Sequence, residues 1–352
     1  MDITDIQPAQ SGSKVVTTLK FLFFLGLGIV IIWLSLRNLT PVEKQEIIHS
    51  FRIANYYWVI LVILLGVISH FFRSLRWILL METMGYKPSV KNTFYAVMVG
   101  YFANLAFPRL GEVTRCGILS KYEKVPFNKG FGTVITERAF DMIIFALLFI
   151  LMFFTQLGIV HSYLEKNIYP GIQGKFSNLF SNPIVVAGMI GLAIFLIVLF
   201  LIFRKKLLRS KIYHKIEHLV IGFWEGLKSL AQLRRPVLFL SYTAIIWTLY
   251  FCMLYFCFFC FSETSLVGPG AGLSALVLGT VSIMITPGGI GLYPAIVQET
   301  LILYGVTNTT GLALGWITWS AQTLMILIVG GISLIMLSFN KNRNDKTRSD
   351  QI

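Results

Sequence analysis

Arginines and carboxylates occur close together in two short segments of an otherwise apolar chain. In NLAFPRLGEVTR, from Asn104 to Arg115, Glu112 and Arg115 are three residues apart and share a face of any helix formed there, while Arg109 follows a proline. The planar guanidinium of arginine binds a phosphate through two parallel hydrogen bonds, and neighbouring carboxylates orient it or accept protons. This spacing indicates a binding site for an anionic group that carries a phosphate.

The second segment, TVITERAFDMIIF, places Glu137 and Asp141 one helical turn apart. In SHFFRSLRW, Arg73 and Arg76 lie at the end of another apolar run. These two arginines either join the anion site or extend their side chains to lipid headgroups. The candidate headgroup-binding residues are Asn104, Arg109, Glu112, Arg115, Glu137, Arg138, Asp141, Arg73 and Arg76.

Two other spacings resemble metal-binding or redox motifs. His214 and His218 are four residues apart, but no carboxylate or cysteine completes a ligand set, so we assign them to a polar helix face. Cys257 and Cys260 have the spacing of a redox pair, but they lie inside an apolar run, which favours packing. We therefore predict no catalytic residues, no metal and no cofactor.

The composition is that of an all-α polytopic membrane protein. Hydrophobic residues make up 56% of the 352 residues and charged residues 13%, and the mean hydropathy of +0.74 lies outside the range of soluble domains. A helix needs roughly 20 apolar residues to cross a hydrocarbon core about 30 Å thick. Six runs satisfy this requirement, at 19–39, 57–81, 131–156, 184–203, 236–261 and 311–338.

The net charge of +14 is unevenly distributed, and Lys and Arg mark the cytoplasmic side of short loops. Basic residues are concentrated at 121–129, at 204–235 and after 340, whereas 157–182 has few and is predicted to be external. Nucleic acid is the rival partner for such basicity, but anionic lipid next to short loops explains it more simply. In the 204–235 segment apolar residues recur at three- and four-residue steps with charged residues between them, which predicts an amphipathic helix at the cytoplasmic surface.

This charge distribution places both termini in the cytoplasm. The predicted organisation is an N-terminal tail at 1–18, a transmembrane domain at 19–338 and a basic tail at 339–352.

Two further apolar segments begin and end on one side of the membrane. Residues 92–120 have basic residues at both ends, and 270–305 is tied to the exterior at both ends, so neither is a single crossing. Proline and glycine interrupt both, which predicts two re-entrant helical hairpins around a central cavity. A plain cytoplasmic loop is the alternative for the first, where Gly111 is expected to ease the turn. The break residues are Pro108, Gly111, Pro287, Gly288, Gly289 and Gly291.

The two halves show a weak internal similarity. Pro108 and Pro287 are 179 residues apart, and at the same shift three further pairs match: Ala96 with Ala275, Gly100 with Gly279 and Gly132 with Gly311. Helix breaks at corresponding places in halves of opposite orientation are typical of inverted-repeat transporters. Chance matches in so apolar a composition are the alternative. Glu299 either faces the cavity or lies near the surface.

Three motifs, in this order, resemble a known family: ANLAFPRLGEVTRCGIL, FGTVITERAFDM and ITPGGIGLYPAIVQETLILYG. They are similar to the flippase-like transmembrane domain of lysylphosphatidylglycerol synthases and of stand-alone bacterial and archaeal proteins built from it, over about residues 19–338. The resemblance implies lipid translocation. Aminoacyl transfer is not expected, because no stretch between the predicted spans is long enough for the soluble lysine-transferring domain of the synthases. It assigns this role to Asn104, Pro108, Arg109, Gly111, Glu112, Arg115, Glu137, Arg138, Asp141, Pro287, Gly288, Gly289 and Gly291.

We therefore expect a lipid translocase of the plasma (inner) membrane. Its substrate is an anionic phospholipid or a polyprenyl-phosphate-linked lipid, and its partners are membrane lipids, with no nucleic acid. A membrane-embedded lipid-modifying enzyme with Glu137 or Asp141 as general base is the rival hypothesis, although no nucleophile or cosubstrate site is evident. A non-catalytic accessory subunit is the third.

Overall fold

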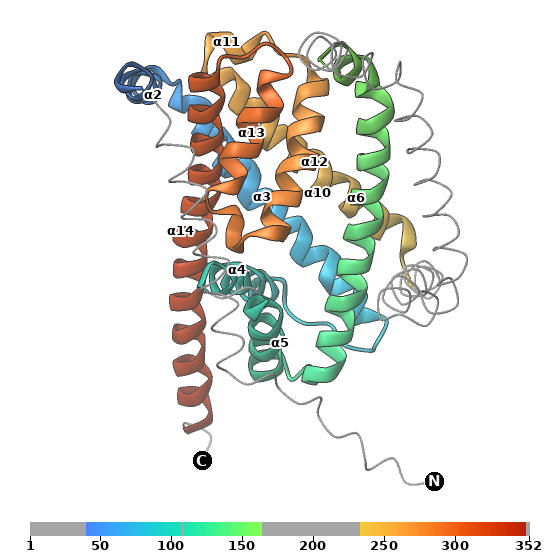
Figure 1. Cartoon of the computed structure of the whole chain (residues 1–352). Helices are drawn as coiled ribbons and strands as arrows, with labels where there is room; N and C mark the ends of the chain where they lie inside the picture. The colour runs from blue at the N-terminus through green and yellow to red at the C-terminus, as the bar shows by residue number, and fades with distance from the viewer. Residues whose placement is uncertain (1–39, 107–108, 164–232, 350–352) are drawn as a thin grey trace, which may run out of the picture. The chain divides into compact units, whose positions relative to one another are not determined.

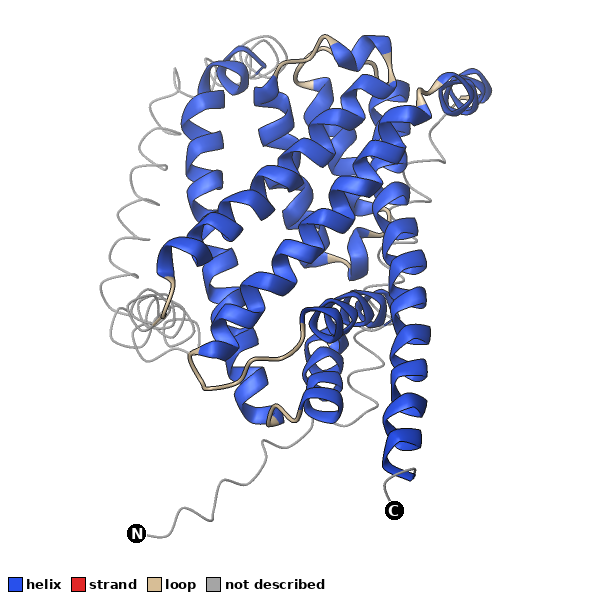
Figure 2. Cartoon of the chain, turned by 180° about the vertical axis from the view of Figure 1, so that it is seen from behind, coloured by secondary structure: helices blue, strands red, loops and turns tan. Residues whose placement is uncertain are grey.

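The computed structural model describes residues 40–106, 109–163 and 233–349, and every regular element in these ranges is a helix (Figures 1 and 2). The predicted spans at 19–39 and 184–203, and nearly all of the predicted amphipathic helix at 204–235, lie outside the described residues. The chain divides into two compact units, which we describe separately. The first unit is Met1–Ile135 with Arg234–Ile352, and the second is Thr136–Leu233.

Within the part of the chain that the structure describes, four helices are long and apolar enough to span a membrane, as predicted for these segments. They are α3 (Tyr56–Glu82), α6 (Phe127–Tyr163), α10 (Pro236–Cys257) and α14 (Asn308–Ser349). Two of them are longer than predicted. Helix α6 continues into the stretch at 157–182 that was expected to be an external loop, and α14 continues into the expected tail at 339–352. Hydropathy marks only the apolar part of a helix. Neither α6 nor α14 is ended by a proline or glycine at the point where its apolar run ends.

The remaining elements are shorter. They are α2 (Pro41–Ile53), α4 (Val90–Ala106), α5 (Leu110–Glu123), α11 (Ser262–Ser265), α12 (Pro269–Ile285), α13 (Leu292–Ile302) and the 3₁₀ turns η2 (Phe258–Cys260) and η3 (Pro287–Gly289).

Helices α4 and α5 pack against each other as an antiparallel pair. At the open end, the Glu123 carboxylate accepts hydrogen bonds from the Ser89 N–H at 3.1 Å and from the Asn92 side chain at 2.6 Å. At the break, Asn104 Oδ1 accepts a hydrogen bond from the N–H of Gly111 at 2.7 Å, which satisfies one of the N–H groups that a helix leaves without an internal partner. The stretch predicted to be broken is therefore two helices and not one span.

The prediction that Gly111 eases this turn is wrong. Gly111 lies in the first turn of α5, and Arg109, just before α5, adopts the left-handed conformation with φ of 67°. A Cβ atom at Gly111 would collide with the carbonyl oxygen of Gly100 and lie 2.7 Å from the Asn104 side chain. The missing side chain therefore serves the close approach of α4 and α5, which local sequence does not reveal.

Helices α12 and α13 form the second pair, and the Ser274 and Tyr304 hydroxyls lie 2.8 Å apart at its open end. The break between them contains three glycines with positive φ, of 60°, 74° and 71°, at Gly288, Gly289 and Gly291. A side chain is strained in this conformation, so glycine is required for the turn. The indole of Trp319 in α14 holds the break in place by donating a hydrogen bond to the Gly288 carbonyl at 2.8 Å.

The broken ends of the two pairs meet. The turn η3 packs against α4, and a Cβ atom built on Gly288 would lie 3.7 Å from Leu105 Cδ2. Figure 1 shows the tip of the α12–α13 pair directed towards α4. This contact brings the break of the second pair to the end of α4, next to the break of the first.

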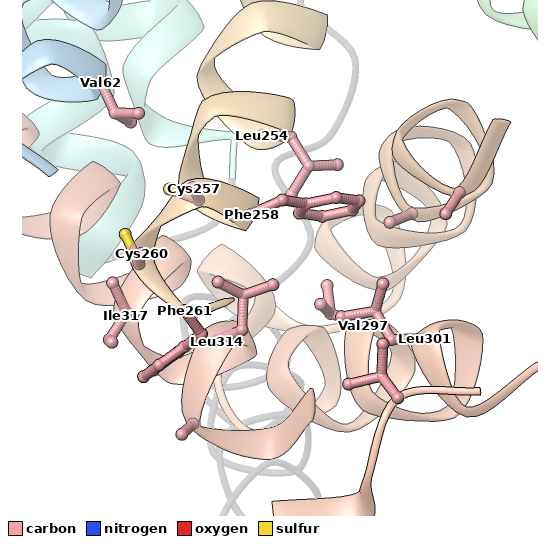
Figure 3. Packing of buried hydrophobic residues seen from close by; sticks show 14 of the residues in the cluster. Val62, Leu254, Cys257, Phe258, Cys260, Phe261, Val297, Leu301, Leu314 and Ile317 are labelled. Carbon is pink, nitrogen blue, oxygen red and sulfur yellow. The ribbon is translucent and has the colours of Figure 1, made fainter. Parts of the chain in front are cut away.

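An apolar core packs α3, α10, α13 and α14 together, away from the two breaks (Figure 3). Val62 of α3 and Leu254 of α10 are buried there with Val297 of α13 and Leu314 of α14. The backbone N–H of Asn55 donates to the carbonyl of Cys260 at 3.0 Å, so the start of α3 is tied to η2. Cys257 and Cys260 are free thiols buried in this core, which agrees with a packing role. The core fixes α3 and α10 side by side, and these helices carry most of the site described next.

Candidate functional site

Three arginines of the first unit are buried inside the helical bundle. The exposed fractions of Arg73, Arg76 and Arg115 are 3%, 0% and 3%. We refer to these three residues as the arginine cluster. Arginine keeps its charge under all ordinary conditions and is almost never fully buried without partners. The burial of Arg73 and Arg76 disagrees with the interpretation that these two side chains extend to lipid headgroups at the membrane surface.

Helix α10 supplies two contacts of Arg76. Its Nη1 donates a hydrogen bond to the hydroxyl of Thr243 at 3.2 Å, and the guanidinium carbon lies 5.6 Å from the centroid of the Phe239 ring. Thr243 and Phe239 are one turn apart on α10, so both contacts come from one helix face. The packing of α3 on α10 therefore sets the position of this side chain.

Arg73 lies between two tyrosine rings from different helices. Its guanidinium carbon is 5.9 Å from the centroid of Tyr101 in α4 and 5.9 Å from that of Tyr250 in α10. The negative face of an aromatic ring attracts a cation by roughly 0.5 to 2 kcal/mol, more where water is excluded. Arg73 therefore lies where α3, α4 and α10 come together.

Arg115 reaches the same region from α5. Its guanidinium carbon lies 4.6 Å from the centroid of the Trp77 ring. The indole itself is fixed, because Trp77 Nε1 donates to the hydroxyl of Thr133 at 2.9 Å. Trp77 is one turn after Arg73 on α3, so Arg73 and the ring beneath Arg115 share a face of that helix.

Other predicted residues of the first hairpin lie outside the arginine cluster. Arg109 is exposed at the break, and Asn104 is engaged with the N-terminus of α5. Glu112 is half-buried in the first turn of α5, where a carboxylate interacts favourably with the positive end of the helix dipole. The structure thus separates Arg109 from Arg115, which the sequence had placed together.

The carboxylates of TVITERAFDM lie in the second unit. Glu137 is fully buried, whereas Arg138 and Asp141 are half-buried, and all three lie on α6. Because they belong to a different unit, the predicted convergence of these residues with the arginines stays a prediction.

The second break has no cation in its sequence, and its contribution is backbone. Gly289 and Gly291 are buried, Gly291 immediately precedes α13, and Glu299 is exposed further along that helix. Among the described residues, no group of three or more His, Cys, Asp and Glu side chains could hold a metal ion. His214 and His218 lie outside the described residues.

The sequence reasoning missed the uncharged side chains of the site, namely Trp77, Tyr101, Thr243 and Tyr250. Only one of them carried a local signal: Trp77 follows Arg73 by one helical turn. The others come from α4 and α10, so only the packing of the helices shows that they belong to the site.

Comparison with known proteins gives a family match over most of the chain. The family described as Lysylphosphatidylglycerol synthase TM region matches residues 18–330. The UPF0104 membrane protein MJ1595 of Methanocaldococcus jannaschii is 30% identical over 158 residues, which are 44% of this chain and 43% of that protein. The glycosyltransferase AglD of Haloferax volcanii is 25% identical over 122 residues, which are 34% of this chain and 19% of that protein. The matches thus span less than half of either relative, and no solved structure matches the chain.

Proposed function

Because the chain belongs to the lysylphosphatidylglycerol synthase TM region family, we propose that this multi-pass membrane protein is a lipid translocase whose arginine cluster binds an anionic headgroup. The burial of Arg73, Arg76 and Arg115 between membrane-spanning helices is the observation that carries the proposal. Each such charge costs roughly 2.5 to 3.5 kcal/mol on insertion scales, so a cluster of three is expensive to keep without a function. The headgroup enters the bundle while the acyl or prenyl chains stay in the bilayer.

The proposed architecture has six full spans and two re-entrant hairpins related by an inverted repeat. Helix boundaries support the repeat. Helix α4 begins at 90 and ends at 106, and α12 begins at 269 and ends at 285, so both boundaries are offset by 179 residues. Helices α5 and α13 end at 123 and 302, which is the same offset. The contact between η3 and α4 supports opposite directions for the two hairpins, because their broken ends meet.

This repeat is symmetric in its backbone and asymmetric in its charge. At an offset of 179, Arg73, Arg76 and Arg115 correspond to Cys252, Tyr255 and Pro294. The headgroup site therefore belongs to the first half. We propose that this half opens to the cytoplasmic side of the plasma membrane, with both termini in the cytoplasm.

Two substrate classes agree with the comparisons. The family is described by the transmembrane region of a phospholipid synthase, and one relative of part of the chain is named a glycosyltransferase. The substrate is accordingly an anionic phospholipid or a polyprenyl phosphate, the latter with a sugar in its headgroup. Both carry the phosphate that arginine recognises.

Reconstitution of the purified protein into liposomes with labelled phosphatidylglycerol, and separately with a labelled polyprenyl-phosphate lipid, tests the proposal. Transfer of a chemically unchanged lipid between leaflets supports translocation. A change in the lipid itself would instead favour a lipid-modifying enzyme with Glu137 or Asp141 as general base. If neither lipid is transferred or chemically changed, the result favours an accessory subunit and contradicts the proposal.

A further inference from the structure

Two ring nitrogens near Arg73 are buried without a hydrogen-bond partner among the described residues. They are Nδ1 of His70 in α3 and Nε1 of Trp247 in α10. His70 is only 2% exposed. Nine in ten or more of the polar atoms buried in proteins have a partner in the protein or in ordered water, so two such nitrogens in one region are candidates for contact with a bound group.

The ring that carries each nitrogen lies next to one of the two tyrosine rings that contact Arg73. The rings of His70 and Tyr101 are 4.4 Å apart between centroids, and those of Trp247 and Tyr250 are 5.9 Å apart. Arg73 lies over both tyrosines, and it follows His70 by three residues on α3. The rings of His70 and Trp247 therefore lie beside the two tyrosines that contact Arg73, one from α3 and one from α10.

Other tryptophans of the protein show that the absence of a partner is not a general feature of its buried indoles. Trp77 donates to the Thr133 hydroxyl at 2.9 Å, and Trp319 donates to the Gly288 carbonyl at 2.8 Å. The fold thus satisfies an indole N–H where the indole has a structural role. Trp247 differs from them in lying beside Tyr250, which Arg73 contacts.

The chemistry of the two nitrogens restricts what the missing group is. An indole N–H only donates, and a neutral imidazole Nδ1 donates or accepts according to its tautomer. The guanidinium of Arg73, which contacts the same two tyrosines, repels cations from this region, so the group is an anion or a neutral acceptor. Phosphate and hydroxyl oxygens can pair with both nitrogens.

Building on the proposed function, we propose that His70 and Trp247 are further binding residues of the arginine cluster, and that they contact oxygen atoms of the lipid headgroup. Neither residue was among those indicated by the sequence. Together with Arg73 they extend the headgroup site along the interface between α3 and α10, beyond Arg76 and Arg115.

Binding of short-chain lipids to the full-length protein in detergent tests this assignment. The probes are short-chain phosphatidylglycerol and phosphatidic acid, with phosphatidylcholine as the zwitterionic reference. His70→Phe and Trp247→Phe keep a ring and remove the nitrogen, and each is expected to weaken binding of the anionic lipid about tenfold. His70→Asn places an amide nitrogen near the Nδ1 position and should bind as the wild type does. Trp58→Phe is the matched control, about 15 residues and so roughly 22 Å away from Arg73 along α3.

The outcomes separate the two proposals. A loss with both anionic lipids assigns the nitrogens to phosphate oxygens, and a loss with phosphatidylglycerol alone assigns them to headgroup hydroxyls; both support the inference. If the wild type binds anionic lipid and both phenylalanine variants bind it equally well, the inference is wrong and the translocase proposal stands. If the wild type does not prefer anionic lipid, the proposed function itself fails. Equal loss of thermal stability with and without lipid, at unchanged affinity, would show a purely structural role and also overturn the inference.

Discussion

The guanidinium of Arg115 lies 4.6 Å from the ring centroid of Trp77, and this pair links the first hairpin to a membrane-spanning helix. The indole is held by Thr133 at the start of α6, so the cation rests on a ring whose orientation is fixed. A Cβ atom built on Gly100 in α4 would lie only 3.3 Å from the Cβ of Arg115, which shows how closely α5 packs on α4. The position of the charge therefore depends on the spacing of α3, α4 and α5.

Replacing Gly111 by alanine should separate the two helices of the first hairpin. The new Cβ would collide with the Gly100 carbonyl oxygen, and overpacking of this kind costs about 1 to 3 kcal/mol. Gly117→Ala is the matched control, because a Cβ there meets nothing within 4 Å and alanine favours the helix. We expect a lower melting temperature and slower lipid transfer for Gly111→Ala only. Equal stability of the two variants would contradict the close packing of α4 and α5.

Arg109 is expected to carry backbone strain. Its φ of 67° is unfavourable for a residue with a side chain by roughly 1 to 2 kcal/mol, so Arg109→Gly should raise the free energy of unfolding by about 1 kcal/mol or less. We predict that the same change lowers translocation about tenfold, because a charge is lost where the two breaks meet. Lys124→Gly relieves the same kind of strain at the end of α5 and should leave translocation unchanged. An Arg109→Gly variant that is less stable and fully active would contradict the prediction.

Periodicity, proline and charge asymmetry together predict much of this fold, because each is a local property of the chain. The spans at 57–81 and 236–261 are confirmed within a few residues, and the break before α5 follows from Pro108. Gly111 shows where local reasoning ends: its function depends on Gly100, which belongs to another helix. The burial of Arg76 is likewise set by Phe239, far away in sequence, so hydropathy could not distinguish it from a side chain at the membrane surface.

Glu263 links the short helix α11 to the start of α14. Its carboxylate accepts hydrogen bonds from the Thr307 N–H at 2.6 Å and from the Thr307 hydroxyl at 3.0 Å. Partial burial acts to raise the pKa of Glu263, but hydrogen bonds from Thr310 and Thr307 outweigh it, so the pKa lies below its ordinary value. The ionised form is therefore the one that stabilises the fold.

A depressed folded-state pKa gives stability that is present above the unfolded-state value of about 4.3 and is lost as the pH falls through the folded-state value. Thermal melts of wild type and Glu263→Gln should thus differ most at neutral pH and converge in acid. Glu299→Gln, an exposed glutamate on α13, serves as the control. A difference between wild type and Glu263→Gln that grows below pH 4 would show that the sign is wrong.

The proposed orientation predicts which ends of the helices face the cytoplasm. Single cysteines at Lys87, after α3, and at Leu266, after α11, replace exposed residues. An impermeant maleimide added to intact cells should label Leu266→Cys, and it should label Lys87→Cys only after the membrane is opened. The wild type controls for labelling of the native cysteines, which are buried or half-buried. The reverse pattern would invert the topology and move the headgroup site to the other leaflet.

The site was harder to predict than the fold, since it combines residues from four helices. Arg73 and Arg115 were identified because a charge in an apolar run is conspicuous. Tyr101 and Tyr250 were not, because an aromatic residue in a membrane helix is ordinary until the structure places an arginine between two of them.

Lipid transfer by liposomes that contain Arg73→Gln, Arg115→Gln or the double variant tests the central claim most directly. Loss of a charge-assisted contact worth about 1.5 to 3 kcal/mol should slow transfer roughly ten- to a hundredfold in each single variant, at normal yield and melting temperature. Arg52→Gln, which removes an exposed arginine of α2, should transfer lipid as the wild type does. If a single variant does not fold, the corresponding Arg→Lys change keeps the charge and tests only the bidentate hydrogen bonding of the guanidinium. A well-folded Arg73→Gln, Arg115→Gln double variant that moves lipid at the wild-type rate would contradict the account.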